Sequence, residues 1–442
     1  MRAIQLMVLS LFGCLLCSNK QSYDSKLLVL DISNLKNDQV MALKSSNVVN
    51  WWVEAGDRIL IQIPGSDKNE LKSRNLPFSI LEERVGLEKS ELSVIRGAHI
   101  NSASGLFKPV FKGGRALIVL KKDAARFLHA HAGHGHDVVV SDFEGSQVLA
   151  EKVRIDPNIL LARSEWSAQQ MLFAKEAMQL VDSDRWYADV QNLSQLNRHI
   201  SSQDNIVARD FVASELKLIP GMKVELQEFS LGVSGRKAWN VIGTYDLSQS
   251  SKKAIFVTGH YDSISDSIGR GAPGAEDNAT GAAGVIEMAR VLSKMEINRK
   301  LVFIAFSGEE QGLLGSKHHV SELAPQEGDQ IEYVINMDMI GYSKDLTYDV
   351  LLETSSKFKT ISDKLATMAS QTRLNVFRSY NPFGSDHMPY INRGIPAVLT
   401  IDNDWDDYVD YHKTTDRIDN VVKDMGWEIL KMNVGTVAAD SL

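Results

Sequence analysis

Three apolar runs in the second half of the chain end in acidic or histidine residues, and this feature constrains the fold most strongly. Each run has the length and composition of a buried strand, and the three lie at 254–259, 301–306 and 333–337. The polar residues that follow them are His260, Asp262, Glu309, Glu310 and Asp338. Helix-like segments alternate with the strands, which predicts a mostly parallel sheet covered by helices on both faces.

The ends of these strands are expected to form one site, because sites in open α/β sheets lie beyond the carboxyl ends of the strands. Burying several carboxylates together is costly unless a cation balances them. The stretch 274–281 adds Asp277 at the start of a helix that runs to about Lys294, and His412 precedes a final amphipathic helix. A metal site explains this set of residues with the fewest assumptions.

The order and local context of these residues resemble those of the secreted bacterial leucyl aminopeptidases with two zinc ions. These are zinc-dependent exopeptidases related to glutamate carboxypeptidase and glutaminyl cyclase. The resemblance covers roughly residues 182–442, and on it the chain is identified as a member of this family. Its motifs are His260-x-Asp262, Asp277, Glu309-Glu310, Asp338, Ser385-Asp386-His387, Gly394-Ile395-Pro396-Ala397 and His412. The resemblance implies an α/β fold in which helices sandwich a mostly parallel mixed sheet.

The resemblance also implies a ligand set for two Zn²⁺ ions per chain, with Asp277 as the bridge between them. The remaining ligands would be His260 and Asp338 on one ion, and Glu310 and His412 on the other. Oxygen and imidazole ligands suit zinc and leave a position open for water. Two ions in one site can share a hydroxide that attacks the peptide bond.

Two further residues receive catalytic roles from the resemblance. Asp262 would hydrogen-bond the far nitrogen of His260 and fix its tautomer. Glu309 would be the general base, which moves a proton from the attacking water to the leaving amine. The peptide bond between Asp277 and Asn278 matches a position at which the family carries a cis bond. The expected activity is the removal of N-terminal residues from peptides.

A substrate pocket is suggested by three residues near the expected ligands, Met339, Phe383 and Tyr411. In the resembling enzymes the position of Met339 lines an apolar pocket, which favours substrates with a hydrophobic N-terminal residue. A plain core role for these side chains is the alternative. Asp386 and His387 are interpreted as structural supports of the site rim.

Other activities on the same fold stay open at the level of sequence. Glutamate carboxypeptidases use the same ligands, so the ligands alone do not distinguish the two ends of a peptide. Glutaminyl cyclase carries one zinc and cyclises its substrate, and the complete two-metal set argues against it. A non-catalytic binding protein of this fold would lack ligands, whereas none is missing here. The aminopeptidase assignment rests on the closer resemblance of the loops.

A chain of 442 residues is long for a single core, which predicts two domains. Residues 22–163 are expected to form a smaller α/β domain with an accessory or propeptide-like role. Its expected strands lie near 27–30, 59–63, 116–120 and 138–140. Residues 164–181 are interpreted as a helical linker, and 182–442 as the catalytic domain. The histidine-rich tract at 129–136 is interpreted as a solvated loop, although clustered histidines can bind metal.

Residues 1–20 are interpreted as an export signal, because Arg2 is followed by an apolar run. Both cysteines of the chain, Cys14 and Cys17, lie in this segment, so the mature protein has no disulfide. Two interpretations stay open: Cys14 is lipidated in a lipoprotein signal, or the signal is cleaved between Cys17 and Lys20. The protein is therefore expected in the periplasm, in the outer membrane as a lipoprotein, or outside the cell.

The net charge of −8 argues against nucleic acid and anionic membranes as partners, since both favour clustered lysine and arginine. Contact with a membrane is expected only through a lipid anchor at the N-terminus. Peptide substrates are the expected partners, and the chain is expected to be a monomer.

Overall fold

The computed structural model describes residues 25–442 with gaps. The positions left out are 33, 36, 47, 56–57, 65–67, 69–70, 72–75, 86, 88, 98–107, 114–115, 131–137, 144–146, 149–151, 232–234, 247–251, 381 and 383. The expected signal segment 1–20 and the larger part of the histidine tract lie outside the described residues. The chain divides into two compact units: an N-terminal unit with most residues before 152, and a C-terminal unit with 152–442.

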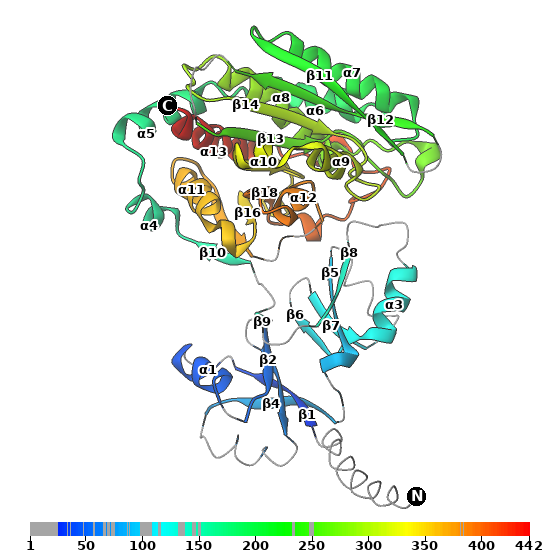
Figure 1. Cartoon of the computed structure of the whole chain (residues 1–442), viewed down its shortest axis with the longest axis vertical. Coiled ribbons are helices and arrows are strands. Elements are labelled where there is room, and N and C mark those ends of the chain that lie inside the picture. Colours follow the sequence, from blue (N-terminus) through cyan, green and yellow to red (C-terminus); the bar gives the residue numbers. More distant parts are fainter. Residues whose placement is uncertain are drawn as a thin grey trace, which may run out of the picture. The chain divides into compact units, whose positions relative to one another are not determined.

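Two small sheets and short helices make up the N-terminal unit (Figure 1). One sheet has the order β4-β1-β3-β2-β9, with β1 (Ser25–Asp31), β2 (Trp51–Ala55), β3 (Arg58–Pro64), β4 (Ser79–Val85) and β9 (Gln147–Val148). The other has the order β6-β7-β5-β8, with β5 (Leu92–Gly97), β6 (Phe111–Gly113), β7 (Ala116–Leu120) and β8 (Val138–Asp142). The helices are α1 (Asn37–Lys44) and α3 (Lys121–Ala130).

Buried side chains from both of these sheets share one apolar core, to which Leu27, Leu60, Val94 and Ile118 belong. This core is possible because the strands place an apolar residue at alternate positions on the inner face. The prediction of a smaller α/β domain before the main one is confirmed.

A nine-stranded mixed sheet of order β10-β17-β16-β18-β15-β13-β14-β12-β11 forms the C-terminal unit. Its strands are β10 (Val153–Ile155), β11 (Met222–Ser230), β12 (Lys237–Tyr245), β13 (Ala254–His260), β14 (Leu301–Phe306), β15 (Ile331–Met337), β16 (Asp349–Glu353), β17 (Asn375–Ser379) and β18 (Ala397–Asp402). The central pairs β14–β13, β13–β15 and β15–β18 are parallel. The pairs β11–β12, β12–β14, β16–β18 and β10–β17 are antiparallel.

Helices cover both faces of this sheet, as Figure 1 shows and as the sequence predicted. One face packs on α5 (Ala168–Gln179), α6 (Ser183–Ser194), α7 (Gln203–Lys217), α8 (Thr280–Leu292), α11 (Lys359–Ala369) and α13 (Lys423–Ser441). The other face packs on α9 (Leu314–Glu322) and α12 (His387–Asn392), and α10 (Pro325–Asp329) precedes β15. In β13, Ile255 and Val257 face the first layer whereas Phe256 faces the second. A strand that is buried on both sides has to be apolar throughout, which explains the three unbroken runs.

The segment 164–181, expected as a linker, belongs to the body of the C-terminal unit. Its helix α5 buries Ala174, Ala177 and Met178 in the same core as α13. The short helix α4 (Pro157–Leu161) and β10 precede it, and β10 extends the large sheet beside β17. The structure therefore places the boundary between the units near residue 152, because the apolar side chains of α5 are covered by the catalytic core.

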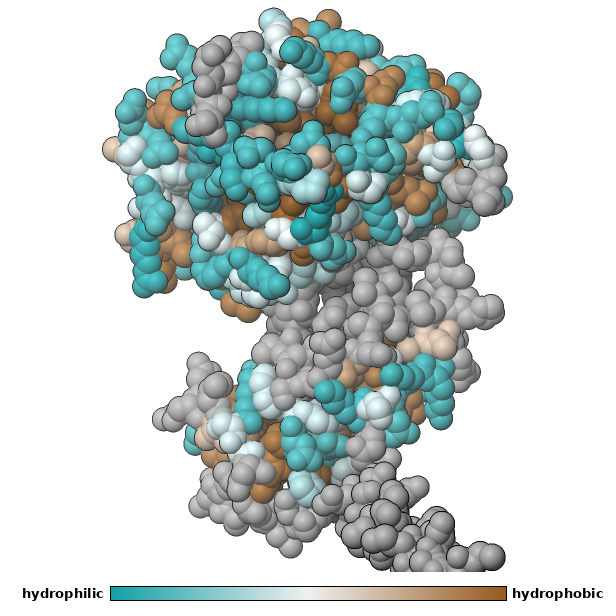
Figure 2. All heavy atoms as spheres, viewed as in Figure 1, coloured by the Kyte–Doolittle hydropathy of each residue, from teal (hydrophilic) through white to brown (hydrophobic). Residues whose placement is uncertain are grey.

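Hydrophilic residues spread over the visible face of the C-terminal unit, with apolar residues scattered between them (Figure 2). Among the described residues, no helix is both long enough and apolar enough to cross a membrane.

Candidate metal centre

Neighbouring parallel strands bring the predicted polar residues together. The order β14-β13-β15 places the end of β13, with His260, between the ends of the other two strands. Glu309 and Glu310 follow β14, and Asp338 follows β15. Asp277 comes from the segment 275–279 that leads into α8, and His412 comes from the loop between β18 and α13.

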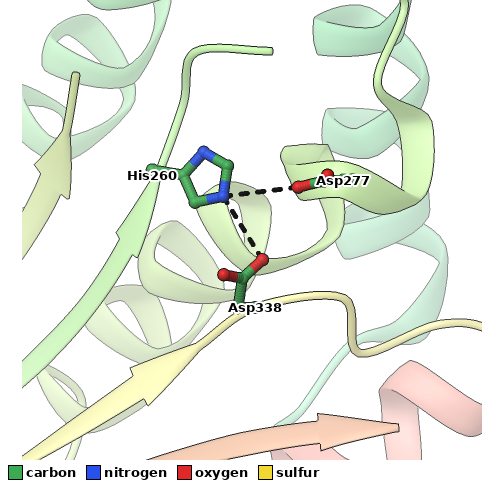
Figure 3. A group of neighbouring side chains, drawn as sticks. All are labelled: His260, Asp277 and Asp338. Carbon is green, nitrogen blue, oxygen red and sulfur yellow. Dashed lines mark hydrogen bonds and ion pairs between the residues drawn. The ribbon is translucent and has the colours of Figure 1, made fainter. Parts of the chain in front are cut away.

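Two groups of three buried residues result, and Asp277 belongs to both. In the first group, His260 Nε2 lies 3.4 Å from Asp277 Oδ1 and 3.3 Å from Asp338 Oδ1 (Figure 3). In the second group, His412 Nε2 lies 3.1 Å from Asp277 Oδ2 and 3.0 Å from Glu310 Oε2. The two carboxylate oxygens of Asp277 thus face different histidines, so this one carboxylate takes part in both groups of candidate ligands.

The buried carboxylates at this site would be stabilised by a bound cation. Glu310 is 2% exposed, and His412 Nε2, at 3.0 Å from its Oε2, is the one partner of its carboxylate among the contacts of the described residues. Burial, together with the charge of Asp277, raises the pKa of Glu310 to about 7. Burial also raises the pKa of Glu309 well above its ordinary value. Buried carboxylates in this state are stabilised by a bound metal, so the residues present fit a zinc site of oxygen and imidazole ligands.

The pKa values of His260 and Asp277 depend on the same balance between burial and neighbouring charges. Burial acts to lower the pKa of His260, but the charges of Asp338 and Glu309 outweigh it and raise this pKa well above its usual range. Burial acts to raise the pKa of Asp277, but hydrogen bonds from His260 and His412 hold it below its ordinary value. A metal ion would bind these residues in their deprotonated forms.

Asp262 lies behind His260 and has a second contact that the sequence did not indicate. Its Oδ1 is 3.6 Å from His260 Nδ1, and its backbone carbonyl oxygen is closer, at 3.2 Å. Its carboxylate also accepts hydrogen bonds from the backbone N–H groups of Glu309 at 3.3 Å and Glu310 at 3.4 Å. Asp262 therefore connects the first histidine to the loop that carries both glutamates.

Glu309 lies beside the two groups and belongs to neither. Its carboxylate is 4.0 Å from His260 Nε2, and the residue is 2% exposed. Gly308, with a φ of +73°, permits a sharp turn between β14 and the two glutamates that follow it.

Several residues that hold the candidate ligands were not predicted in that role. Ser385 Oγ donates a hydrogen bond to Asp338 Oδ2 at 2.6 Å, and it accepts one from Asn336 Nδ2 at 2.8 Å. Asp416 accepts hydrogen bonds from the backbone N–H groups of Glu276 at 2.9 Å and Asp277 at 3.1 Å. The motif Ser385-Asp386-His387 was the signal for the first contact, whereas no local pattern indicated the second.

Asp386 and His387, expected as supports of the site rim, are both fully buried. Burial raises the pKa of Asp386 to about 7 and lowers the pKa of His387 to about 3. They lie inside the C-terminal unit at the start of α12, and their role as supports of the site stays a prediction.

Of the three candidate pocket residues, the structure describes Met339 and Tyr411. Met339 is 3% exposed and packs in an apolar cluster with Trp405 and Tyr408. Tyr411 packs against this cluster, and its ring stacks on that of His412 with 3.8 Å between the centroids. Phe383 lies outside the described residues. The peptide bond between Asp277 and Asn278 is cis, as the resemblance implied.

The C-terminal unit thus combines a mixed sheet that is parallel at its centre, helices on both faces, and two buried groups of candidate metal ligands that share one carboxylate. Residues 240–437 match the family model described as peptidase family M28. The match lies within the part of the chain for which the sequence analysis identified a family of zinc-dependent exopeptidases, and it agrees with that identification.

Among curated relatives, aminopeptidase YwaD of Bacillus subtilis is 33% identical over 179 residues, which cover 38% of this chain and 37% of that protein. A probable zinc metalloprotease of Pyrenophora tritici-repentis is 35% identical over 149 residues, which cover 31% of each. The matches thus span roughly a third of the length of these relatives.

Solved structures share the fold. An aminopeptidase from Aneurinibacillus sp. strain AM-1 is similar with a TM-score of 0.51 and 19% identity, over 61% of this chain and 96% of that chain. LapB from Legionella pneumophila is similar with a TM-score of 0.57 and 17% identity, over 79% of this chain and 99% of that chain. At these identities the likeness supports the fold class, which is the one predicted.

Proposed function

We propose that this protein is a metal-dependent aminopeptidase that removes N-terminal residues from peptides, with two zinc ions per chain. The observation that carries the proposal is the position of Asp277, whose two oxygens face His260 and His412 in separate buried groups. The match to the model of peptidase family M28 and the names of the relatives, an aminopeptidase and a zinc metalloprotease, support the reaction and the metal.

When bound, two zinc ions would supply an activated water and stabilise the negative charge that develops on the carbonyl oxygen of the substrate. His260, Asp277 and Asp338 would hold one ion, and Glu310 and His412 would join Asp277 on the other. Asp262 orients the ring of His260 from behind, and it holds the loop of the two glutamates through their backbone N–H groups.

Glu309 is the residue best placed to move protons, because it is buried beside both groups without belonging to either. Its raised pKa lets it hold a proton at pH values where an exposed glutamate has lost it. It would take a proton from the attacking water and deliver it to the leaving amine.

An apolar cluster beside the site supports a preference for hydrophobic N-terminal residues. Met339 directly follows a candidate ligand and packs with Trp405 and Tyr408, while Tyr411 lies between this cluster and His412. A side chain of leucine or phenylalanine bound here would bury apolar area at roughly 25 cal/mol per Å².

The test is hydrolysis of the para-nitroanilides of leucine, lysine and glutamate by the zinc-loaded protein, with N-acetyl-leucine para-nitroanilide as a blocked substrate. We expect cleavage of the leucine anilide to be fastest and the blocked substrate to resist. Glu309→Gln should lose activity by about a hundredfold or more while its zinc content is unchanged. Glu322→Gln, an exposed glutamate on α9, is the matched control and should be fully active.

Failure of the zinc-loaded wild type to cleave any free anilide would overturn the aminopeptidase proposal. Peptides with a free C-terminus and a blocked N-terminus, and peptides that begin with glutamine, would then test the carboxypeptidase and cyclase activities. Full activity of Glu309→Gln would overturn the assignment of the base alone.

A further inference from the structure

Arg198 is a fully buried arginine whose guanidinium contacts backbone carbonyl groups. Its Nε donates a hydrogen bond to the carbonyl oxygen of Tyr261 at 2.8 Å, and its Nη2 donates to that of Gly274 at 2.7 Å. Its Nη1 donates to the carbonyl oxygens of Leu193, at 2.9 Å, and Pro273. Among the described residues, no carboxylate forms an ion pair with it. Burying a charge in this way costs free energy unless hydrogen bonds and nearby opposite charges compensate for the lost water.

The carbonyl groups that Arg198 contacts belong to two segments that carry candidate metal ligands. Tyr261 lies between His260 and Asp262 at the end of β13. Pro273 and Gly274 directly precede the segment 275–279, in which Asp277 lies. One side chain therefore fixes the end of β13 relative to the loop that supplies the shared carboxylate.

The position of Arg198 is itself well defined. Its carbonyl oxygen accepts hydrogen bonds from Asn205 Nδ2 at 2.8 Å and from the backbone N–H of Ser263 at 3.3 Å. Gly274 adopts a left-handed conformation with a φ of +48°, and a Cβ there would lie 3.0 Å from Nη2 of Arg198 and 2.3 Å from the carbonyl oxygen of Asp277. Glycine at position 274 is thus required mainly by the closeness of the backbone at Asp277, and it also leaves room for the guanidinium.

The negative charges around Arg198 belong to carboxylates in and beside the candidate metal centre. Burial lowers the pKa of Arg198 to about 10, and the charges of Asp416, Asp262, Asp277 and Glu310 act in the opposite direction. The guanidinium is therefore charged at neutral pH, and its attraction to the nearby carboxylates offsets part of the cost of burying them.

We propose that Arg198 is a positioning residue of the metal centre, which holds His260 and Asp277 at the separation needed to bind the same ion. This inference rests on the proposed zinc site. The five N–H donors of arginine lie in a fixed plane and reach carbonyl groups of two segments at once, whereas lysine has three donors on a single nitrogen. Lysine at this position would keep the charge and lose most of the geometry.

The experiment compares Arg198→Met and Arg198→Lys with Arg299→Met in the full-length chain. Arg299 is a buried arginine that donates a hydrogen bond to the carbonyl oxygen of Lys253. It precedes β14, whereas the two glutamates of the candidate site follow that strand. It therefore controls for the loss of a buried guanidinium elsewhere in the unit. The measurements are zinc affinity by competition with a chelator, and the melting temperature of each variant with and without zinc.

We expect Arg198→Met to bind zinc about tenfold to a hundredfold more weakly, which is the usual effect of removing a residue that orients metal ligands. Its rise in melting temperature on addition of zinc should shrink accordingly. Arg198→Lys should fall between this variant and the wild type, and Arg299→Met should bind zinc as the wild type does. Activity lost in Arg198→Met should return in part at high zinc concentration.

Unchanged zinc affinity in Arg198→Met, with equal losses of melting temperature with and without zinc, would mean that Arg198 serves the fold alone and would overturn the inference. If Arg198→Met does not fold, Arg198→Lys decides by the same two measurements. A wild type that binds no zinc in this titration would instead overturn the proposed function.

Discussion

Asp277 is the residue on which both candidate metal groups depend, because its two carboxylate oxygens face different histidines. We predict that Asp277→Asn loses both zinc ions, since an amide has one oxygen and no charge to share between them. Asp338→Asn and Glu310→Gln should each lose one ion, because each residue belongs to a single group. Zinc per chain, measured after gel filtration, distinguishes these results. Retention of both ions by Asp277→Asn would contradict a shared carboxylate.

The titrating residues predict how the stability of the metal-free protein depends on pH. Burial raises the pKa values of Glu310, Asp386 and Asp416 to about 7. The folded state therefore holds protons that the unfolded state releases between about pH 4 and pH 7, and the free energy of unfolding falls as the pH rises through this window. His260, whose pKa is raised, has the same sign and loses its contribution above its ordinary value of 6.5.

Zinc reverses this trend, because it binds the deprotonated ligands. The rise in melting temperature on addition of zinc should therefore grow from about pH 5 to about pH 8. Thermal unfolding with zinc and with a chelator, at several pH values, measures both curves. A metal-free protein that becomes steadily more stable over this range would show that the carboxyl groups are not protonated in the folded state.

The candidate ligands could be predicted from the sequence, whereas the residues that hold them could not. His260, Glu310 and Asp338 lie at or shortly after the ends of apolar strands, and the geometry of parallel sheets brings such positions together. Arg198 and Asp416 contact the same site through backbone atoms of residues that are far away in the sequence. No local pattern distinguishes them from surface residues, because their environment is set by the folded core.

At the scale of elements, the contact between α6 and α13 leaves no room for a side chain at Gly426. A Cβ at this position would lie 2.0 Å from Cη2 of Trp186, a rigid and fully buried indole that donates a hydrogen bond to the carbonyl oxygen of Thr280 at 3.0 Å. We predict that Gly426→Ala lowers the free energy of unfolding by roughly 1–3 kcal/mol, the usual cost of overpacking a core. Urea unfolding measures this change.

Gly435, on the same helix, provides the matched control for that substitution. A Cβ there would lie 2.8 Å from Sδ and 2.9 Å from Cγ of Met368, and 2.9 Å from Sδ of Met178, and methionine side chains adapt more easily than an indole. Alanine is also favoured over glycine within a helix by about 1 kcal/mol. Gly435→Ala should therefore be close to neutral, and equal effects of the two substitutions would rule out a specific clash with Trp186.

The strands were predicted more accurately than the connections between them. The runs at 254–259, 301–306 and 333–337 became β13, β14 and β15, because unbroken apolar segments bounded by polar residues form central strands. The antiparallel edges of the sheet were not predicted, since the direction of an edge strand depends on how the chain returns to it. Helix α5 was interpreted as a linker, yet its residues Ala174, Ala177 and Met178 are buried in the core beside α13, a contact that only the fold reveals.

At the scale of the whole molecule, the boundary near residue 152 predicts which fragment retains the stability of the C-terminal unit. The segment 152–181 pairs β10 with β17 and packs α5 on α13. Two hydrogen bonds join it to α13: Gln170 Nε2 donates to the carbonyl oxygen of Ala439 at 2.9 Å, and Trp166 Nε1 donates to Asp440 at 2.8 Å.

We predict that a chain beginning at residue 152 unfolds in one cooperative transition, and that a chain beginning at 182 melts at a clearly lower temperature. Removing α5 exposes the side of α13 that it covers, and each buried apolar side chain of this kind contributes roughly 1.5–3 kcal/mol. Thermal unfolding of the two fragments, with hydrogen exchange across α13, measures the difference. Loss of protection should concentrate in α13, since its core contacts with α5 are the ones removed. Equal melting temperatures would instead place the segment outside the folding unit, as a linker would be.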